Sequence, residues 1–154
     1  MTNLCCEVLD ALKGKTLSTA ESCTGGGIGA ALTAIPGSSS VYKGGIISYC
    51  NEIKHRVLGV DEALLVNKGA VSAEVAVAMA VGARNALQTD VAVSVTGLAG
   101  PGGDEFNNPV GTVFVGYACK HSAVSRHYVF SGDRDAVRDQ AVEAALRLIL
   151  EFQL

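Results

Sequence analysis

The residues best suited to chemistry lie where a short β-prone run, Thr16–Ala20, meets a cluster of glycines at positions 25 to 27. Ser22, Cys23 and Thr24 stand between them, a pattern that predicts a strand, a turn and the start of a helix. A helix N-terminus carries unpaired N–H groups and a partial positive charge, so it stabilises an anion or a developing oxyanion. The same pattern also fits a Ser/Thr helix cap followed by loosely packed glycines.

A second pair of candidates is Tyr49 and Lys54. We expect Tyr49 to end a strand that begins at Gly44, and Lys54 to lie one turn into the following helix. Ligands in open α/β sheets bind beyond the carboxyl ends of the strands, so both side chains could face a cleft beside Ser22. Taken alone, a tyrosine at a strand end and a lysine in a helix more often have structural roles.

The third candidate segment follows the apolar run Val91–Thr96, which is typical of a strand buried on both faces. That run leads into a long glycine-rich loop, Gly97–Pro109, whose length points to function. We therefore expect the segments after Ala20, Tyr49 and Thr96 to converge on one cleft.

The order of the elements that must position these residues indicates the fold class. Hydrophobic periodicity predicts helices over residues 3–13, 24–34, 51–58, 61–66 and 73–87, and a last helix capped by Asp133. Strands are expected over residues 16–20, 44–49 and 91–96, with a hairpin over 112–120 and 122–130. This order predicts an α/β fold, a three-layer arrangement with a mixed β-sheet covered by helices, in a single domain over residues 1–154.

Composition excludes several classes of function. The formal net charge is −3 and no Lys/Arg cluster occurs, which argues against nucleic acid as a partner. The apolar runs are too short to span a membrane and no signal peptide is evident, so we expect a soluble cytoplasmic protein that contacts no membrane. The five cysteines are scattered, with no C-x-x-C pair and no histidine at the spacing of a zinc site, so we expect neither a metal site nor disulfides. A small apolar α/β domain of this kind is expected to form a homo-oligomer.

Two short motifs match known patterns only in part. Gly25-x-Gly27-x-x-Ala30 fits the dinucleotide-binding fingerprint, but polar residues separate it from the strand and there is no room for a second mononucleotide-binding half. Ser40-Val-Tyr-Lys43 fits the S-x-x-K pattern of serine acyl enzymes without its companion motifs, which favours a helix start with a solvated lysine.

Six sequence blocks, in order and across nearly the whole chain, resemble the CinA C-terminal domain, the nicotinamide-nucleotide amidase family. The blocks are residues 20–26, 45–54, 69–72, 95–101, 109–112 and 131–138. The resemblance implies hydrolysis of a linear amide, converting nicotinamide mononucleotide to nicotinic acid mononucleotide and ammonia in pyridine-nucleotide salvage, with no cofactor. Many family members carry a further N-terminal molybdopterin-binding-like domain, and activity belonging to that domain is not expected from these residues.

The resemblance also implies a set of catalytic residues. It makes Ser22 the nucleophile and Lys54 its general base, with Tyr49 positioned to orient Lys54 or to relay a proton. Lysine is a base only when neutral, so the pKa of Lys54 must lie well below its usual value of about 10.4. Cys23 remains a rival nucleophile, because a helix N-terminus activates a thiolate.

Substrate binding is implied for a second set of positions. The N–H groups near Thr24, Gly25 and Gly26 would hold either the oxyanion or the nucleotide phosphate, and the residues leave that choice open. Thr96, Gly97 and the loop that follows would close the pocket. An arginine at the start of the last helix would bind the phosphate or ribose; Arg134 is our choice, and Arg138, one turn later, remains an alternative.

A function from another class uses the same pocket. The domain could be a nucleotide-binding or interaction module without turnover, linked to the competence or DNA-damage responses from which the family takes its name. A pure binder has no need of a base, so Ser22, Tyr49 and Lys54 together favour the amidase.

Overall fold

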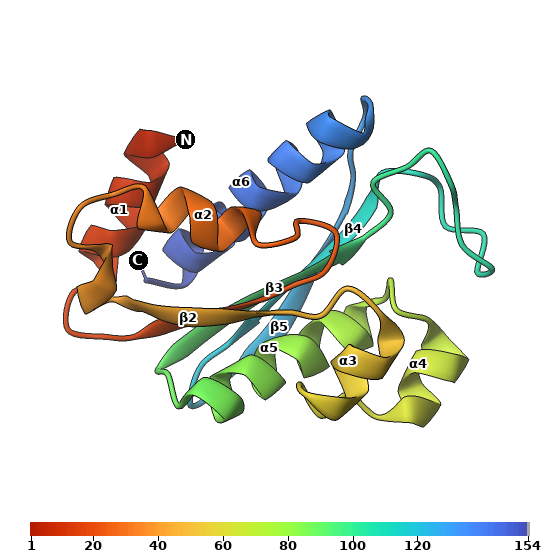
Figure 1. The fold of residues 1–154 in the computed structure, drawn as a ribbon, viewed down its shortest axis with the longest axis horizontal. Coiled ribbons are helices and arrows are strands. Elements are labelled where there is room, and N and C mark those ends of the chain that lie inside the picture. The colour runs from red at the N-terminus through yellow and green to blue at the C-terminus, as the bar shows by residue number, and fades with distance from the viewer. Residues whose placement is uncertain (154) are drawn as a thin grey trace.

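A computed structural model describes residues 1–153 of the chain. Its centre is a mixed five-stranded sheet in the order β2-β1-β3-β4-β5 (Figure 1). The strands are β1 (Leu17–Glu21), β2 (Tyr42–Ile47), β3 (Val91–Gly97), β4 (Thr112–Ala118) and β5 (Ala123–Val129). β2, β1 and β3 run parallel, while β4 and β5 form the predicted antiparallel hairpin, paired to β3 through β4. The predicted α/β class with a mixed sheet is confirmed.

Helices cover both faces of the sheet, as the order of elements predicted (Figure 1). They are α1 (Thr2–Ala11), α2 (Gly27–Thr33), α3 (Asn51–Arg56), α4 (Glu62–Lys68), α5 (Ala73–Leu87) and α6 (Arg134–Gln153), with a short 3-10 helix η1 (Ser38–Ser40) before β2. α1, α2 and α6 pack over one face, and α5 packs over the other with α3 and α4 beside it. Each face therefore buries its own apolar cluster against the central strands.

α5 has the predicted bounds, and its start has a local cause. The Oγ of Ser72 accepts a hydrogen bond from the N–H of Val75, which satisfies one of the free donors of the first turn. Its buried face comprises Val75, Ala76, Met79, Ala80 and Ala83, whereas Ala86 is exposed. The small side chains of these alanines let α5 lie close to the sheet. At Gly116 on β4, an added Cβ atom would lie 2.2 Å from the carbonyl oxygen of Ala76, so only glycine fits there.

The strand order creates a switch point at the carboxyl ends of β1 and β3. β1 is central, and the chain leaves it through α2 to reach β2 on one side, then crosses through α3, α4 and α5 to β3 on the other side. Connections that diverge in this way leave a crevice at the strand ends, which is where open α/β sheets bind ligands. Three segments begin at this edge: those that follow β1, β2 and β3.

Candidate active site

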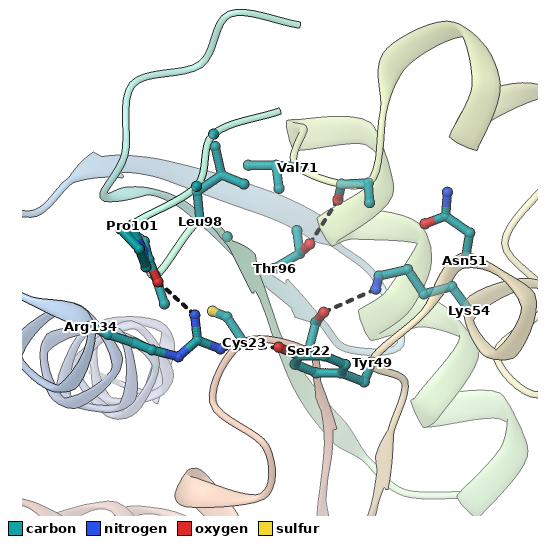
Figure 2. Close-up of a pocket in the computed structure, with 16 residues that line it drawn as sticks. Ser22, Cys23, Tyr49, Asn51, Lys54, Val71, Thr96, Leu98, Pro101 and Arg134 are labelled. Atoms are coloured by element: carbon teal, nitrogen blue, oxygen red, sulfur yellow. Dashed lines mark hydrogen bonds between the residues drawn. The ribbon is translucent and has the colours of Figure 1, made fainter. Parts of the chain in front are cut away.

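A cavity of about 390 Å³ opens at the carboxyl ends of β1 and β3 (Figure 2). The three segments that the sequence predicts to converge all contribute to its wall, and the start of α6 closes one side. The lining residues are Ser22, Cys23, Tyr49, Asn51, Lys54, Ala70, Val71, Thr96, Gly97, Leu98, Ala99, Gly100, Pro101, Gly102, Gly103 and Arg134.

Ser22 and Lys54 meet at the base of this cavity (Figure 2). Ser22 follows β1 directly, and its N–H donates to the carbonyl oxygen of Val95 on β3, which fixes the chain at the strand end. The Nζ of Lys54 donates to the Oγ of Ser22 at 2.9 Å. Lys54 reaches this point from the middle of α3, and its side chain is 1% exposed.

The contacts of the Lys54 amine decide which protonation state it favours. Its second hydrogen bond, at 2.8 Å, goes to the carbonyl oxygen of Ser48, and no carboxylate among the described residues pairs with it. Burial without a counter-charge penalises the ammonium form, so the pKa of Lys54 falls from 10.5 to about 8. At pH 7 about a tenth of Lys54 is then in the neutral form that a general base requires, far more than for an unperturbed lysine.

Cys23, the rival nucleophile, also lines the cavity but is held in its neutral form. Burial raises the pKa of its thiol to about 11, despite the nearby positive charges of Lys54 and Arg138. A thiol with a raised pKa is a poor nucleophile, because the thiolate is the reactive species. The electrostatics therefore favour Ser22 over Cys23.

The turn after Ser22 differs from the predicted helix start. α2 begins at Gly27 rather than Thr24, and the buried carboxylate of Glu21 accepts hydrogen bonds from the N–H groups of Ile28 and Gly29 and from the hydroxyl of Thr24. The protein thus places its own anion at this helix N-terminus. A phosphate or pyrophosphate cannot use these N–H groups, which removes the basis of the dinucleotide fingerprint.

Thr24, Gly25 and Gly26 lie outside the lining of the cavity, contrary to the sequence-based expectation. Gly25 and Gly26 have φ angles of +59° and +101°, so both serve the turn, and the Gly25 N–H donates to the carbonyl oxygen of Ser22. The N–H groups of Cys23 and Thr24 make no hydrogen bond within residues 1–153. The N–H of Gly26 is likewise without an acceptor there, and of these three residues only Cys23 lines the cavity beside Ser22.

The Tyr49 side chain bonds to Arg134 rather than to Lys54. β2 ends at Ile47, two residues earlier than predicted, and the Tyr49 side chain is 61% exposed. Its hydroxyl accepts a hydrogen bond from Arg134 at 3.1 Å. The contact that orients Lys54, expected from Tyr49, comes from the Ser48 carbonyl.

The two candidate arginines of α6 have separate places. Arg134 lines the cavity and donates to the carbonyl oxygen of Gly100 at 2.7 Å, so it links the loop after β3 to Tyr49 (Figure 2). Arg138 lies outside the lining and donates to the carbonyl oxygens of Cys23 and Thr24. Arg134 therefore faces the ligand space, and Arg138 braces the turn after Ser22.

Thr96 and Gly97 both line the cavity, as expected. The Thr96 hydroxyl donates to the carbonyl oxygen of Ala70 at 2.7 Å and so ties the end of β3 to the segment before α5. Close packing requires a glycine at position 97, because a Cβ there would lie 2.8 Å from the carbonyl oxygen of Thr112 on β4.

Sequence reasoning missed Asn51 and the role of Glu21. Asn51 lines the cavity from the first turn of α3, three residues before Lys54. That spacing puts both side chains on one helical face and could have singled it out.

No group of three or more His, Cys, Asp or Glu residues within 1–153 could hold a metal ion. No helix in this part of the chain is long and apolar enough to cross a membrane.

The fold and site define an α/β domain with a buried serine and lysine in contact at the switch point of its sheet. The family model described as the CinA C-terminal domain matches residues 2–153, and the chain belongs to this family. It is 47% identical, over 138 residues, to the nicotinamide-nucleotide amidohydrolase PncC of Escherichia coli K12, covering 89% of this chain and 84% of that protein.

Other relatives are much longer than this chain. A CinA-like protein of Geobacter sulfurreducens is 49% identical over 134 residues, which is 87% of this chain but only 32% of that protein. Among solved structures, a competence-damaged protein (CinA) superfamily protein of Enterobacter cloacae superimposes with a TM-score of 0.96 at 32% identity, covering 99% of this chain and 92% of that one. The fold described above is therefore the fold of the family.

Proposed function

We propose that this chain hydrolyses the carboxamide of nicotinamide mononucleotide, giving nicotinic acid mononucleotide and ammonia. The observation that carries the proposal is the 2.9 Å contact between the Lys54 Nζ and the Ser22 Oγ in a site that lowers the lysine pKa. The 47% identity to the PncC amidohydrolase of E. coli supports the choice of substrate.

In the first half of the reaction, neutral Lys54 accepts the hydroxyl proton of Ser22 while the Ser22 Oγ attacks the carboxamide carbon. The Ser48 carbonyl can only accept, so it takes one N–H of the amine and leaves the nitrogen lone pair for Ser22. The C–N bond then breaks, and the Lys54 ammonium returns its proton to the leaving nitrogen, which departs as ammonia. A nicotinoyl ester remains on Ser22.

In the second half, water attacks the ester carbon and Lys54 takes a proton from that water. The C–O bond to Ser22 breaks, the proton passes back to the Ser22 oxygen, and nicotinic acid mononucleotide leaves. The N–H group of Cys23, which lines the cavity next to Ser22, is our candidate for holding the oxyanion in both steps, since it has no acceptor within the described chain.

The charge of the cavity favours an anionic substrate. Arg134 lines it, no Asp or Glu belongs to its described lining, and no described carboxylate forms an ion pair with this guanidinium. We assign Arg134 to the phosphate of the nucleotide, with Tyr49 positioning the guanidinium through its hydroxyl.

Ammonia release from nicotinamide mononucleotide by the purified protein tests this function, with nicotinamide riboside as the control that lacks the phosphate. We expect turnover of the nucleotide and a much lower kcat/KM for the riboside. Binding of the nucleotide by calorimetry without ammonia release would contradict the amidase and favour the non-catalytic binding module.

A further inference from the structure

The cavity contains one side-chain carbonyl oxygen, the Oδ1 of Asn51. No Asp, Glu or Gln belongs to the described lining, and the other polar side chains are hydroxyls, a thiol or cations. The Ser22 hydroxyl is bonded to Lys54, and the Tyr49 hydroxyl accepts from Arg134. Asn51 is therefore the one strong neutral acceptor that a side chain presents to a ligand here.

Three carbonyl oxygens of the cavity wall already accept hydrogen bonds. The engaged carbonyls are those of Gly100, bonded to Arg134, of Ala70, bonded to Thr96, and of Leu98, bonded to the N–H of Gly111. The carbonyl oxygens of Ala99, Pro101, Gly102 and Gly103 accept none within the described chain, so Asn51 adds a free side-chain acceptor on α3 to the backbone acceptors of the loop.

Asn51 is well placed to meet the reacting group. It is the first residue of α3, and the three-residue spacing to Lys54 puts both side chains on the same face of the helix. Figure 2 shows its amide beside the Lys54 side chain, at the edge of the space above Ser22. Its side chain is exposed and makes no hydrogen bond within residues 1–153.

We propose that the Asn51 Oδ1 accepts a hydrogen bond from the NH₂ group of the scissile carboxamide and thereby selects the amide substrate over the acid product. The inference rests on the proposed amidase function and names the group that reads the reacting end of its substrate. A carboxamide offers two N–H donors at that position. The product carboxylate offers none, so this hydrogen bond to Oδ1 is lost when the C–N bond has been cleaved.

This selection counteracts an opposing attraction in the same cavity. At pH 7 the Lys54 amine is mostly protonated and attracts the carboxylate of the product, which would slow its release. The hydrogen bond from the carboxamide to Asn51 opposes that preference for the carboxylate. Asn51 is thus a specificity residue, and no bond to it forms or breaks during the reaction.

The test compares Asn51→Ala with wild type on two substrates, nicotinamide mononucleotide and the methyl ester of nicotinic acid mononucleotide. The ester keeps the carbonyl, the ring and the phosphate but has no N–H at the reacting group. Glu52→Gln is the matched control, because Glu52 is the next residue of α3, is exposed, pairs with Arg56 and does not line the cavity.

We expect Asn51→Ala to lower kcat/KM for the amide by about tenfold, the effect of one hydrogen bond, and to leave ester hydrolysis within about twofold. The inhibition constant of nicotinic acid mononucleotide should stay constant or fall; a rise would show that the Asn51 amide donates its Nδ2–H to the product carboxylate, and would overturn the selection. Glu52→Gln should behave as wild type throughout.

Equal losses on amide and ester would show a general structural role for Asn51 and overturn the proposal, as would an unchanged amide rate. Failure of the proposed function is distinguishable, because it appears in the wild-type protein as an absence of ammonia release. That result would remove the inference together with the function on which it rests.

Discussion

The Nζ of Lys54 lies 2.9 Å from the Oγ of Ser22, although the two residues are 32 positions apart in the chain. Both are buried, at 1% and 7% exposed, and no described carboxylate pairs with the amine. A lysine that was there only for stability would gain from a counter-charge. The arrangement instead keeps the amine close to neutrality beside a hydroxyl, which is the state that proton abstraction needs.

The pH dependence of the reaction should follow the titration of Lys54. Because burial lowers its pKa to about 8, only the neutral form above that pH is fully competent as a base. We expect kcat/KM for nicotinamide mononucleotide to rise about tenfold per pH unit below pH 8 and to level off above it. Stopped assays of ammonia between pH 6 and 9.5 measure this, and a flat or falling profile would exclude Lys54 as the base.

Lys54→Met should abolish turnover and stabilise the fold. The lysine pKa is lower in the folded state, about 8, than in the unfolded chain, about 10.4, so the unfolded state binds more protons between these values. The penalty is therefore fully present below pH 8 and is relieved as the pH rises towards 10. At pH 7 the variant should gain on the order of 3 kcal/mol in unfolding free energy.

Urea unfolding of both proteins at pH 7 and pH 10 measures this gain. The stability difference should shrink at the higher pH, because the folded-state lysine is neutral there and the unfolded-state lysine has begun to lose its proton, which relieves most of the penalty. A variant that is less stable at pH 7 would mean that Lys54 contributes more by its hydrogen bonds than it costs by its charge.

Substitution of the two arginines of α6 should separate their roles. Arg134→Leu should raise KM for nicotinamide mononucleotide by about 10- to 100-fold, the effect of a hydrogen bond to a charged group, and change nicotinamide riboside little. Arg138→Leu removes the donors to the Cys23 and Thr24 carbonyls, so it should lower kcat for both substrates and reduce stability. Steady-state kinetics on both substrates decide, and the reverse pattern would assign the phosphate to Arg138.

Glu21→Gln should destabilise the protein, although Glu21 does not line the cavity. The Glu21 carboxylate accepts three hydrogen bonds around the start of α2, two at Oε1 and one at Oε2, and glutamine would replace one of these oxygens by an NH₂ group that cannot accept. We expect a loss of about 1–3 kcal/mol in unfolding free energy. Chemical unfolding measures it against the exposed Glu52→Gln variant, which should change by less than about 0.5 kcal/mol. A stability equal to wild type would show that the carboxylate does not hold the turn.

Much of the framework followed from local patterns. The alternation of strands and helices, the late hairpin and the bounds of α5 depend on periodicity and on a cap at Ser72, all of which lie within short segments. The approach of Ser22 and Lys54 could also be predicted, because both follow strands whose carboxyl ends a parallel sheet brings to one edge.

What could not be predicted depends on contacts distant in sequence. The start of α2 moved to Gly27 because the Glu21 carboxylate captures the helix N–H groups, and no local pattern distinguishes it from a surface glutamate. Arg134 and Arg138 are one turn apart and indistinguishable until the loop after β3 is in place. Asn51 passed as an ordinary polar residue at a helix start, since its importance depends on a cavity without carboxylates.

The most direct test of Ser22 as the nucleophile is ammonia release from nicotinamide mononucleotide by Ser22→Ala and Cys23→Ala beside the wild-type protein. Loss of the attacking oxygen should lower kcat by at least about 10³-fold in Ser22→Ala. Cys23→Ala should retain activity within about tenfold, because the thiol has a pKa of about 11 and supplies no thiolate. Turnover that survives Ser22→Ala and disappears in Cys23→Ala would contradict the account.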